Sequence, residues 1–321
     1  MSTDPEHDVV VVGGGAAGLS AAVVLARSLR SVVVVDAGEP RNAPSEGAHN
    51  VLGREGVPPL ELLAAGRAEA ERYGARIRSG RAVAARRERN GFAVELAGGG
   101  SLRARRLLLA TGLVDELPDV PGVRELWGRG VLHCPYCHGW EVRGRRIAVL
   151  GTGPMSVHQT LLFRQLSEDV TLLRHTMPDP GQEALEQLAA LGVPVVDGTV
   201  RRLHREGGRL RAVVLEDGRE IAADALAVAP RFVARTGLYE QLGGSPSEHP
   251  VGGTSIATEP MGRTAVPGVW AAGNAGDLAA TVAAAAAAGV AAGAGLNAEL
   301  VAEDAATAVA RARTGARAVQ T

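Results

Sequence analysis

At 321 residues the chain is long enough for two domains, and its 46% apolar residues are typical of globular proteins. A formal net charge of −1, with both signs mixed along the chain, offers neither the basic surface that nucleic acid requires nor a polybasic membrane patch, so we expect small-molecule or protein partners. The sequence contains no lysine, which excludes Schiff-base catalysis and a P-loop lysine.

The first predicted unit is a βαβ segment at the N-terminus. The acidic and polar residues before it do not resemble a secretion signal, so we expect a cytoplasmic protein. An apolar strand over residues 9–12 precedes a glycine-rich turn at 13–18, a helix over 19–29 and a second strand over 32–36. Glycines at the spacing GxGxxG allow a tight turn and a close approach of pyrophosphate, and Asp36 is placed to accept ribose hydroxyls. We predict a dinucleotide site here, with a plain tight turn as the alternative.

Three strands and one helix are predicted between this unit and the cysteines. Pro58-Pro59 indicates the first turn of an amphipathic helix that reaches about Tyr73. Strand-like runs at 81–87, 92–96 and 102–110 are separated by glycine-rich turns. We expect a small meander laid over the first domain.

Cys134 and Cys137 are the only cysteines, and two residues separate them. In a cytosolic protein this spacing is typical of a redox dithiol, because the thiols can close a small ring with little backbone movement. Pro135 is suited to begin a helix whose N-terminus would lower a thiol pKa. The alternatives are a structural cysteine pair or half of a zinc site with His133 and His138. Zinc is disfavoured because adjacent Cys and His seldom surround one tetrahedral ion and the sequence has no second knuckle, so we predict no metal site.

His138 follows the dithiol directly. An imidazole that titrates near neutrality can take a proton from a thiol or return it to a leaving thiolate. We therefore predict a general acid/base role for His138, with a merely exposed histidine as the alternative.

A second, degraded βαβ segment follows. Its strand at 147–150, turn at 151–156, helix at 157–166 and strand at 170–174 repeat the first pattern. Ser156 stands where the third glycine is expected, Pro154 occupies the turn, and no acid ends the second strand. Whether this turn binds NAD(P)H or is only structural stays open.

The remaining segments complete the predicted architecture. Strands at 193–196, 210–216 and 225–229 belong to the second domain, and 243–253 is a return linker. The uncharged stretch at 278–296 is nearly all Ala and Gly, so we predict a buried helix rather than a membrane span. The fold class is α/β with two Rossmann-like, three-layer ββα nucleotide-binding domains, the second inserted into the first. The predicted ranges are 1–117 with 244–321, and 118–243 for the inserted domain with the cysteines.

Four ordered landmarks resemble those of the low-molecular-weight thioredoxin reductases over nearly the whole chain. They are the N-terminal glycine fingerprint, Ala110-Thr111-Gly112, the CxxC shortly before the second fingerprint, and Ala272-Gly273-Asn274. The resemblance implies FAD in the discontinuous first domain, the dithiol in the inserted domain, and a homodimer. It also implies that Cys137 lies nearer the flavin and that Cys134 exchanges with substrate.

The resemblance further implies which residues contact FAD. The first turn meets the pyrophosphate, Asp36 the adenosine ribose and Val83 the adenine, and the family usually has Asp where this chain has Asn274. The implied FAD contacts are Gly13, Gly15, Ala16, Ala17, Gly18, Asp36, Ala37, Arg41, Asn42, Asn50, Val83, Thr111, Gly112, Gly273, Asn274 and Val282.

Three departures indicate a branch of this family. His138 replaces the family's Asp after the dithiol, the paired arginines that read the NADPH 2′-phosphate are missing, and the string CPYCHGW at 134–140 is distinctive. That string, together with PRNAP at 40–44, resembles the dithiol oxidases of the gliotoxin and holomycin pathways, which close disulfides in small natural products and pass electrons to O2. We therefore expect an FAD-dependent oxidase of a small-molecule dithiol. The alternatives are an NAD(P)H-dependent disulfide reductase, acting on a thioredoxin-like protein, and a flavin-binding redox sensor without turnover.

Overall fold

The computed structural model describes residues 6–250 and 252–318, which form two compact units. Unit 1 comprises the described residues up to Arg41, Leu60–Val114 and those from Phe232 on. Unit 2 comprises Asn42–Pro59 and Asp115–Arg231. The predicted domain ranges placed residues 42–59 in the first domain and 232–243 in the inserted domain, whereas in the structure 42–59 group with unit 2 and 232–243 with unit 1.

Unit 1 is built on a seven-stranded sheet in the order β3-β2-β1-β6-β5-β4, with β19 also paired to β6. Strands β3, β2, β1, β6 and β19 are parallel, and β4, β5 and β6 form the antiparallel meander that the sequence predicted. The strands of this sheet are β1 (His7–Val12), β2 (Val32–Asp36), β3 (Arg76–Ser79), β4 (Ala82–Glu88), β5 (Gly91–Leu96), β6 (Ser101–Leu109) and β19 (Val269–Ala271).

The core of unit 1 lies on both faces of this sheet, and the central strand β1 contributes side chains to each face. Val11 of β1 pairs with Val34 of β2 and Leu108 of β6, and all three are fully buried. A continuous run of valines suits a parallel strand that is covered on both faces. The other elements of unit 1 are α1 (Ala16–Arg27), α2 (Pro59–Arg72), β16 (Arg231–Ala234), α7 (Gly237–Gln241), β17 (Ser247–Glu248), β18 (Thr254–Ser255), η2 (Pro260–Gly262), η3 (Gly273–Ala275) and α8 (Val282–Ala318).

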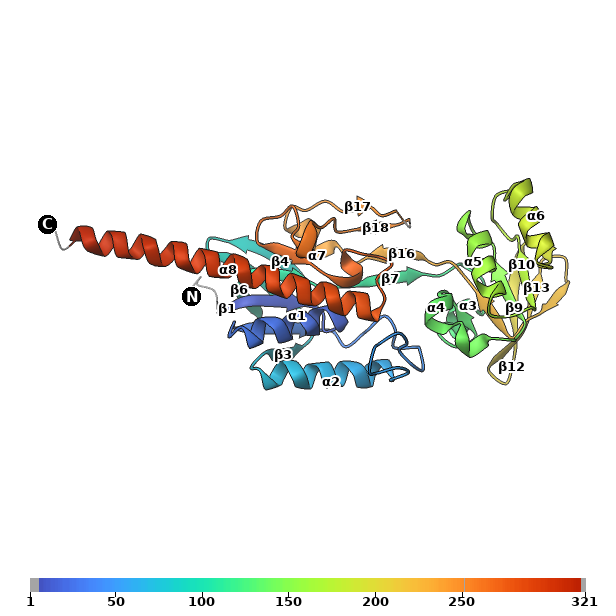
Figure 1. Ribbon diagram of the computed structural model, residues 1–321, viewed down its shortest axis with the longest axis horizontal. Coiled ribbons are helices and arrows are strands. Elements are labelled where there is room, and N and C mark those ends of the chain that lie inside the picture. The colour runs from blue at the N-terminus through green and yellow to red at the C-terminus, as the bar shows by residue number, and fades with distance from the viewer. Residues whose placement is uncertain (1–5, 251, 319–321) are drawn as a thin grey trace. The chain divides into compact units, whose positions relative to one another are not determined.

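Helix α8 lies beside α1 in unit 1 (Figure 1). By length and composition α8 could cross a membrane, but Ala292, Leu296 and Leu300 are fully buried in the core that α1 shares. Gly289 allows the close approach, since a Cβ there would lie 2.0 Å from the carbonyl oxygen of Ala17. One side of α8 is therefore part of the core of unit 1, but Val290 and Val301 are about half exposed, so the predicted buried helix is only partly buried.

Unit 2 repeats the architecture with a five-stranded parallel sheet in the order β11-β10-β9-β15-β8 and a three-stranded antiparallel sheet β12-β13-β14. Its elements are α3 (Val123–Leu126), β8 (Val131–Leu132), α4 (Pro135–His138), η1 (Trp140–Val142), β9 (Ile147–Leu150), α5 (Met155–Arg164), β10 (Val170–Leu173), α6 (Gln182–Ala190), β11 (Val195–Val196), β12 (Val200–Glu206), β13 (Arg209–Leu215), β14 (Glu220–Ala222) and β15 (Ala225–Ala227); β7 (Leu113–Glu116) precedes them. The α/β class with two Rossmann-like units is confirmed.

The structure corrects several predicted bounds. Helices α1 and α5 begin two to three residues earlier than predicted, because each starts directly at its glycine turn. Strand β12 was missed, since charged residues interrupt its apolar pattern, and the predicted linker at 243–253 contains β17.

Candidate functional site

The first glycine turn leaves the N-terminus of α1 open. Gly13 has φ of +114°, and a Cβ there would lie 2.1 Å from the carbonyl oxygen of Ala110. A Cβ at Gly18 would lie 1.9 Å from the carbonyl oxygen of Gly13, so the fold itself requires both glycines. At Gly15, in contrast, a Cβ would meet no atom within 4 Å, and no side chain caps the helix there. The first N–H groups of α1 therefore face open space that suits a phosphate.

Asp36 lies at the end of β2, as predicted, beside the same turn. Its carboxylate forms an ion pair with Arg67 of α2 and accepts a hydrogen bond from the N–H of Gly38 at 3.0 Å. A Cβ at Gly14 would lie 2.5 Å from the carboxylate, so Gly14 also makes room for this acid. Because an ionised carboxylate has about four lone-pair sites, Asp36 retains capacity for ribose hydroxyls. The role of Arg67 was missed, since a helical arginine carries no motif.

Two further predicted segments converge on this turn from distant parts of the chain. Ala110, whose carbonyl Gly13 approaches, directly precedes Thr111 and Gly112 at the end of β6. Gly273 has φ of +67°, and a Cβ there would lie 2.8 Å from the Cβ of Ala17. The glycine turn, the segment after β6 and the segment at Gly273 therefore approach one another closely. Together they form a cradle of backbone, which fits the pyrophosphate and ribityl part of FAD.

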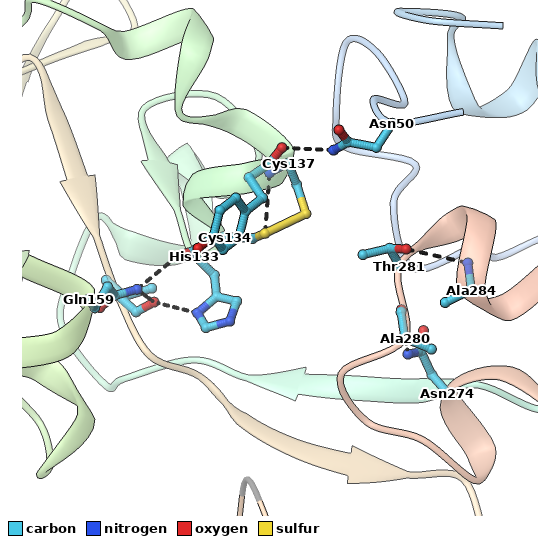
Figure 2. The surroundings of a disulfide bond; sticks show 11 residues. Asn50, His133, Cys134, Cys137, Gln159, Asn274, Ala280, Thr281 and Ala284 are labelled. Atoms are coloured by element: carbon cyan, nitrogen blue, oxygen red, sulfur yellow. Dashed lines mark hydrogen bonds between the residues drawn. A yellow bond between two sulfur atoms is a disulfide. The ribbon is translucent and has the colours of Figure 1, made fainter. Parts of the chain in front are cut away.

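Asn274 explains a departure from the implied pattern. Its side-chain amide donates hydrogen bonds to the carbonyl oxygens of Asp277 at 3.0 Å and Ala280 at 2.9 Å, the second of which Figure 2 shows. A carboxylate could not donate to these carbonyls, so this loop requires the amide rather than the Asp of the family. Val282 follows as the first residue of α8, where the hydroxyl of Thr281 accepts from the N–H of Ala284 at 3.4 Å.

The other predicted FAD contacts lie on different elements. The guanidinium of Arg41 stacks over the ring of Phe232 at 4.9 Å, and Ala37 is exposed just after β2. Val83 lies on β4, the last strand in the sheet order, and is 47% exposed. Asn42 and Asn50 group with unit 2, where Asn50 contacts the dithiol turn.

The dithiol lies at the start of a short helix. Cys134 is the N-cap residue of α4, Pro135 is its first residue as predicted, and Cys134 and Cys137 form a disulfide with their Cα atoms 5.2 Å apart. The N–H of Cys137 donates a hydrogen bond to the sulfur of Cys134 at 3.2 Å. Both cysteines are partly exposed, so their sulfur atoms can take part in thiol exchange. Within residues 6–250 and 252–318 no group of three His, Cys, Asp or Glu side chains is arranged to hold a metal ion.

His138 ends α4 next to the dithiol. Burial lowers the pKa of His138 below its ordinary value of 6.5; the carboxylate of Glu141 opposes this effect and His49 adds to it. His49 in turn contacts two carboxylates, with Nδ1 2.7 Å from Glu55 and Nε2 3.5 Å from Glu141. The lowered pKa keeps His138 neutral at physiological pH, which is the state that accepts a proton from a thiol.

Two exposed aromatic residues are close to the cysteines in sequence. Tyr136, between the cysteines, is 71% exposed, and Trp140 is 65% exposed. The guanidinium of Arg143 lies 3.8 Å from the centre of the Trp140 ring. Two of the chain's few aromatic residues therefore lie within the string CPYCHGW at 134–140.

The second glycine turn is closed by its own side chains. Ser156, only 1% exposed, accepts hydrogen bonds on its hydroxyl oxygen from the N–H groups of Thr152 at 3.1 Å and Gly153 at 3.3 Å. The N–H groups of Thr176 and Met177 both donate to the carbonyl of Gly151 at 3.0 Å, and a Cβ at Gly151 would lie 2.6 Å from the sulfur of Met177. Two of the N–H groups of this turn, those of Thr152 and Gly153, are therefore used within the protein, although a Cβ at Gly153 would meet no atom within 4 Å.

The two basic residues that follow β10, Arg174 and His175, also have partners within the protein. Arg174 lies 3.2 Å from the carboxylate of Asp197 and 4.0 Å from that of Asp179. Nδ1 of His175 accepts from the N–H of Val200 at 3.0 Å, and burial lowers the pKa of His175. Neither side chain is an unpaired cation placed to read a 2′-phosphate.

Comparisons with known proteins agree with this arrangement. Residues 7–292 match the family described as Pyridine nucleotide-disulphide oxidoreductase. The chain is 35% identical to thioredoxin reductase tcpT of Claviceps purpurea over 293 residues, which cover 88% of this chain and 90% of the relative. It is 31% identical to thioredoxin reductase sirT of Leptosphaeria maculans over 292 residues, covering 85% and 88%. The crystal structure of HlmI is 49% identical and superposes with a TM-score of 0.89 over 96% of this chain and 97% of that one. These similarities confirm the resemblance that the four landmarks predicted.

Proposed function

Because the chain belongs to the pyridine nucleotide-disulphide oxidoreductase family, we propose that it is an FAD-dependent oxidase that closes a disulfide in a small-molecule dithiol, with O2 as electron acceptor. Membership of the family makes the chain an oxidoreductase. The direction of electron flow, the acceptor and the substrate class are the content of the proposal.

The cradle of unit 1 fits FAD. Gly13, Gly15 and the N-terminus of α1 would hold the pyrophosphate, Asp36 the adenosine ribose, and Gly273 with Asn274 the adjoining chain. When bound, FAD supplies a two-electron acceptor that restores the Cys134–Cys137 disulfide and gives the electrons to O2, so that dithiol and O2 yield disulfide and H2O2.

The dithiol turn of unit 2 carries the exchange with substrate. A substrate thiolate attacks the sulfur of Cys134, the Cys134–Cys137 bond breaks, and Cys137 leaves as a thiolate. The second substrate thiol loses its proton to neutral His138, and its thiolate attacks the substrate sulfur of the mixed disulfide. The substrate disulfide forms, Cys134 is released as a thiolate, and the hydrogen bond from the Cys137 N–H stabilises that thiolate.

The closed second glycine turn is the observation that carries the choice of oxidase over reductase. A nicotinamide dinucleotide requires backbone N–H groups for its phosphates, and here the hydroxyl of Ser156 already accepts from two of them while Met177 packs against Gly151. An oxidase does not need this site. A reductase does.

Anaerobic flavin reduction tests the proposal. Dithiothreitol should bleach the yellow flavin of the purified holoprotein, and admitted air should restore the colour with formation of H2O2. NADPH and NADH should leave the flavin yellow. The Cys134→Ser/Cys137→Ser double variant controls for direct reduction of flavin by dithiothreitol. Reduction by NADPH faster than ~1 s⁻¹, a rate typical of enzyme turnover, would contradict the proposal.

A second candidate is an NAD(P)H-dependent reductase of a thioredoxin-like protein. The names of tcpT and sirT and the retained βαβ arrangement of unit 2 favour it. Rapid bleaching by NADPH in the same experiment, followed by reduction of a protein disulfide, is its distinguishing result.

A further inference from the structure

We propose that Asn50 is a positioning residue for the dithiol, which sets the orientation of the Cys137 N–H toward the sulfur of Cys134. The proposal rests on the proposed function, because it concerns the cysteine that exchanges with substrate. It differs from the FAD contact that the resemblance implied for this residue.

The side chain of Asn50 contacts the dithiol turn directly. Its amide nitrogen donates to the carbonyl oxygen of Tyr136 at 2.9 Å, and Figure 2 shows the Asn50 side chain directed toward the turn at Cys137. Tyr136 is the residue immediately before Cys137, so this carbonyl and the Cys137 N–H belong to one peptide unit. Because a trans peptide is planar, its C=O and N–H point in opposite directions. Holding the carbonyl on Asn50 therefore directs the N–H away from Asn50, and it lies 3.2 Å from the sulfur of Cys134.

The loop that carries Asn50 is itself held in place. Ala48 and Val57 form a bridge, with the Ala48 N–H 2.8 Å from the Val57 carbonyl oxygen. The carboxylate of Glu55 accepts from the N–H of Asn50 at 2.8 Å and contacts His49 at 2.7 Å. Asn50 has φ of +59°, a conformation that asparagine tolerates better than most residues. The position thus needs both a left-handed backbone and an amide donor, which asparagine supplies together.

The peptide between His133 and Cys134 is held by a different element, helix α5. Gln159 of α5, only 7% exposed, donates from its amide nitrogen to the carbonyl oxygens of His133 at 2.8 Å and Val228 at 3.1 Å. The Cys137 N–H also lies 3.3 Å from the Cys134 carbonyl oxygen within α4, so the Asn50 contact acts together with the hydrogen bonds of the turn itself to orient this peptide. A hydrogen bond to a thiolate favours the charged form, so the orientation of the Cys137 N–H lowers the pKa of the Cys134 thiol.

Alkylation of Cys134 tests the proposal without any substrate turnover. In a Cys137→Ser background, which keeps the backbone N–H at position 137, the rate of reaction with iodoacetamide is measured as a function of pH. Asn50→Gly keeps the left-handed backbone and removes the amide, and Asn50→Asp keeps the shape and cannot donate when ionised. Asn90→Gly, on an exposed turn of unit 1, is the matched control.

Both Asn50 variants should shift the alkylation profile of Cys134 to higher pH and slow the reaction at pH 7 about three- to tenfold, as expected for the weakening of one hydrogen bond to a charged group. The control should follow the parent. Unchanged profiles in both variants would overturn the proposal, and loss of FAD with an unchanged profile would return Asn50 to the role of a cofactor contact. Failure of dithiothreitol to bleach the flavin would refute the oxidase and leave this measurement unaffected.

Discussion

The two glycine turns have the same backbone plan and opposite surroundings. A Cβ would meet no atom within 4 Å at Gly15 of unit 1 or at Gly153 of unit 2, and no side chain caps α1 or α5. In unit 2 the hydroxyl of Ser156 accepts from the N–H groups of Thr152 and Gly153, and Met177 packs against Gly151. The turns therefore differ in the N–H groups of Thr152 and Gly153, which the second turn binds to its own serine hydroxyl. A glycine motif therefore indicates a βαβ fold, whereas the neighbours of its N–H groups decide whether it can bind a phosphate.

The comparison suggests a division of labour between the units. Unit 1 keeps an open turn that fits FAD, and unit 2 keeps the Rossmann scaffold while carrying the dithiol. Helix α5 follows the second glycine turn. Its Gln159 donates a hydrogen bond to the carbonyl oxygen of His133, the residue before Cys134. Changes in one unit should consequently affect the cofactor, and changes in the other the thiol chemistry.

The largest expected effect belongs to His138 in unit 2. His138→Ala should slow flavin reduction by dithiol about 10²–10⁴-fold, the usual cost of losing a general base, with FAD content unchanged. Because burial lowers the pKa of His138 below its ordinary value of 6.5, the acid limb of the parent rate should lie at lower pH than that of an ordinary histidine. The variant should lack this acid limb in stopped-flow measurements. Replacement of the exposed His158 of α5, His158→Ala, is the control. Parental rates across the pH range in His138→Ala would show that His138 does not act as the base.

Gly15→Ala in unit 1 should weaken FAD binding about tenfold or more, which corresponds to about 1.4 kcal/mol or more. The added methyl group meets no protein atom within 4 Å, so the apoprotein should keep its free energy of unfolding. Titration of apoprotein with FAD measures the affinity. Gly153→Ala is the counterpart in the second turn, where a Cβ also meets no atom within 4 Å, and it should leave FAD affinity unchanged. Equal affinities in the two variants would remove the distinction between the turns.

Ser156→Ala should lower the free energy of unfolding by about 1–3 kcal/mol, because two N–H groups lose their acceptor. Flavin content and oxidation of dithiol by the folded protein should stay parental. Urea denaturation with Ser101→Ala, an exposed serine of β6, as reference provides the measurement. A stability equal to that of the reference would mean that the hydroxyl does not close the turn.

The smallest effect is expected for Asp197→Ala. The Asp197 side chain is 80% exposed, so loss of its ion pair with Arg174 should change the free energy of unfolding by no more than about 0.5 kcal/mol. Arg174 would gain freedom to meet a 2′-phosphate, yet NADPH should still fail to reduce the flavin because Ser156 and Met177 keep the turn closed. Rapid reduction by NADPH in this variant would identify the ion pair, rather than the turn, as the barrier.

Local patterns in the chain were enough to predict the repeated βαβ units, the meander β4–β6, and the dithiol with Pro135 at the start of its helix. Each depends on neighbours within about one turn or one strand, through alternation, glycine spacing and capping preferences. The α/β class and the family resemblance followed from the order of such landmarks.

Tertiary structure decided which of these landmarks meet and what their polar groups bind. Arg67 reaches Asp36 from another helix, Gly273 reaches Ala17 from the far end of the chain, and Asn50 reaches Tyr136 across 86 positions. The role of Ser156, which replaces an expected glycine, also became clear only from the two N–H groups that donate to its hydroxyl. Such contacts depend on side-chain direction and on distances through space, which hydrophobic periodicity and motif spacing do not encode.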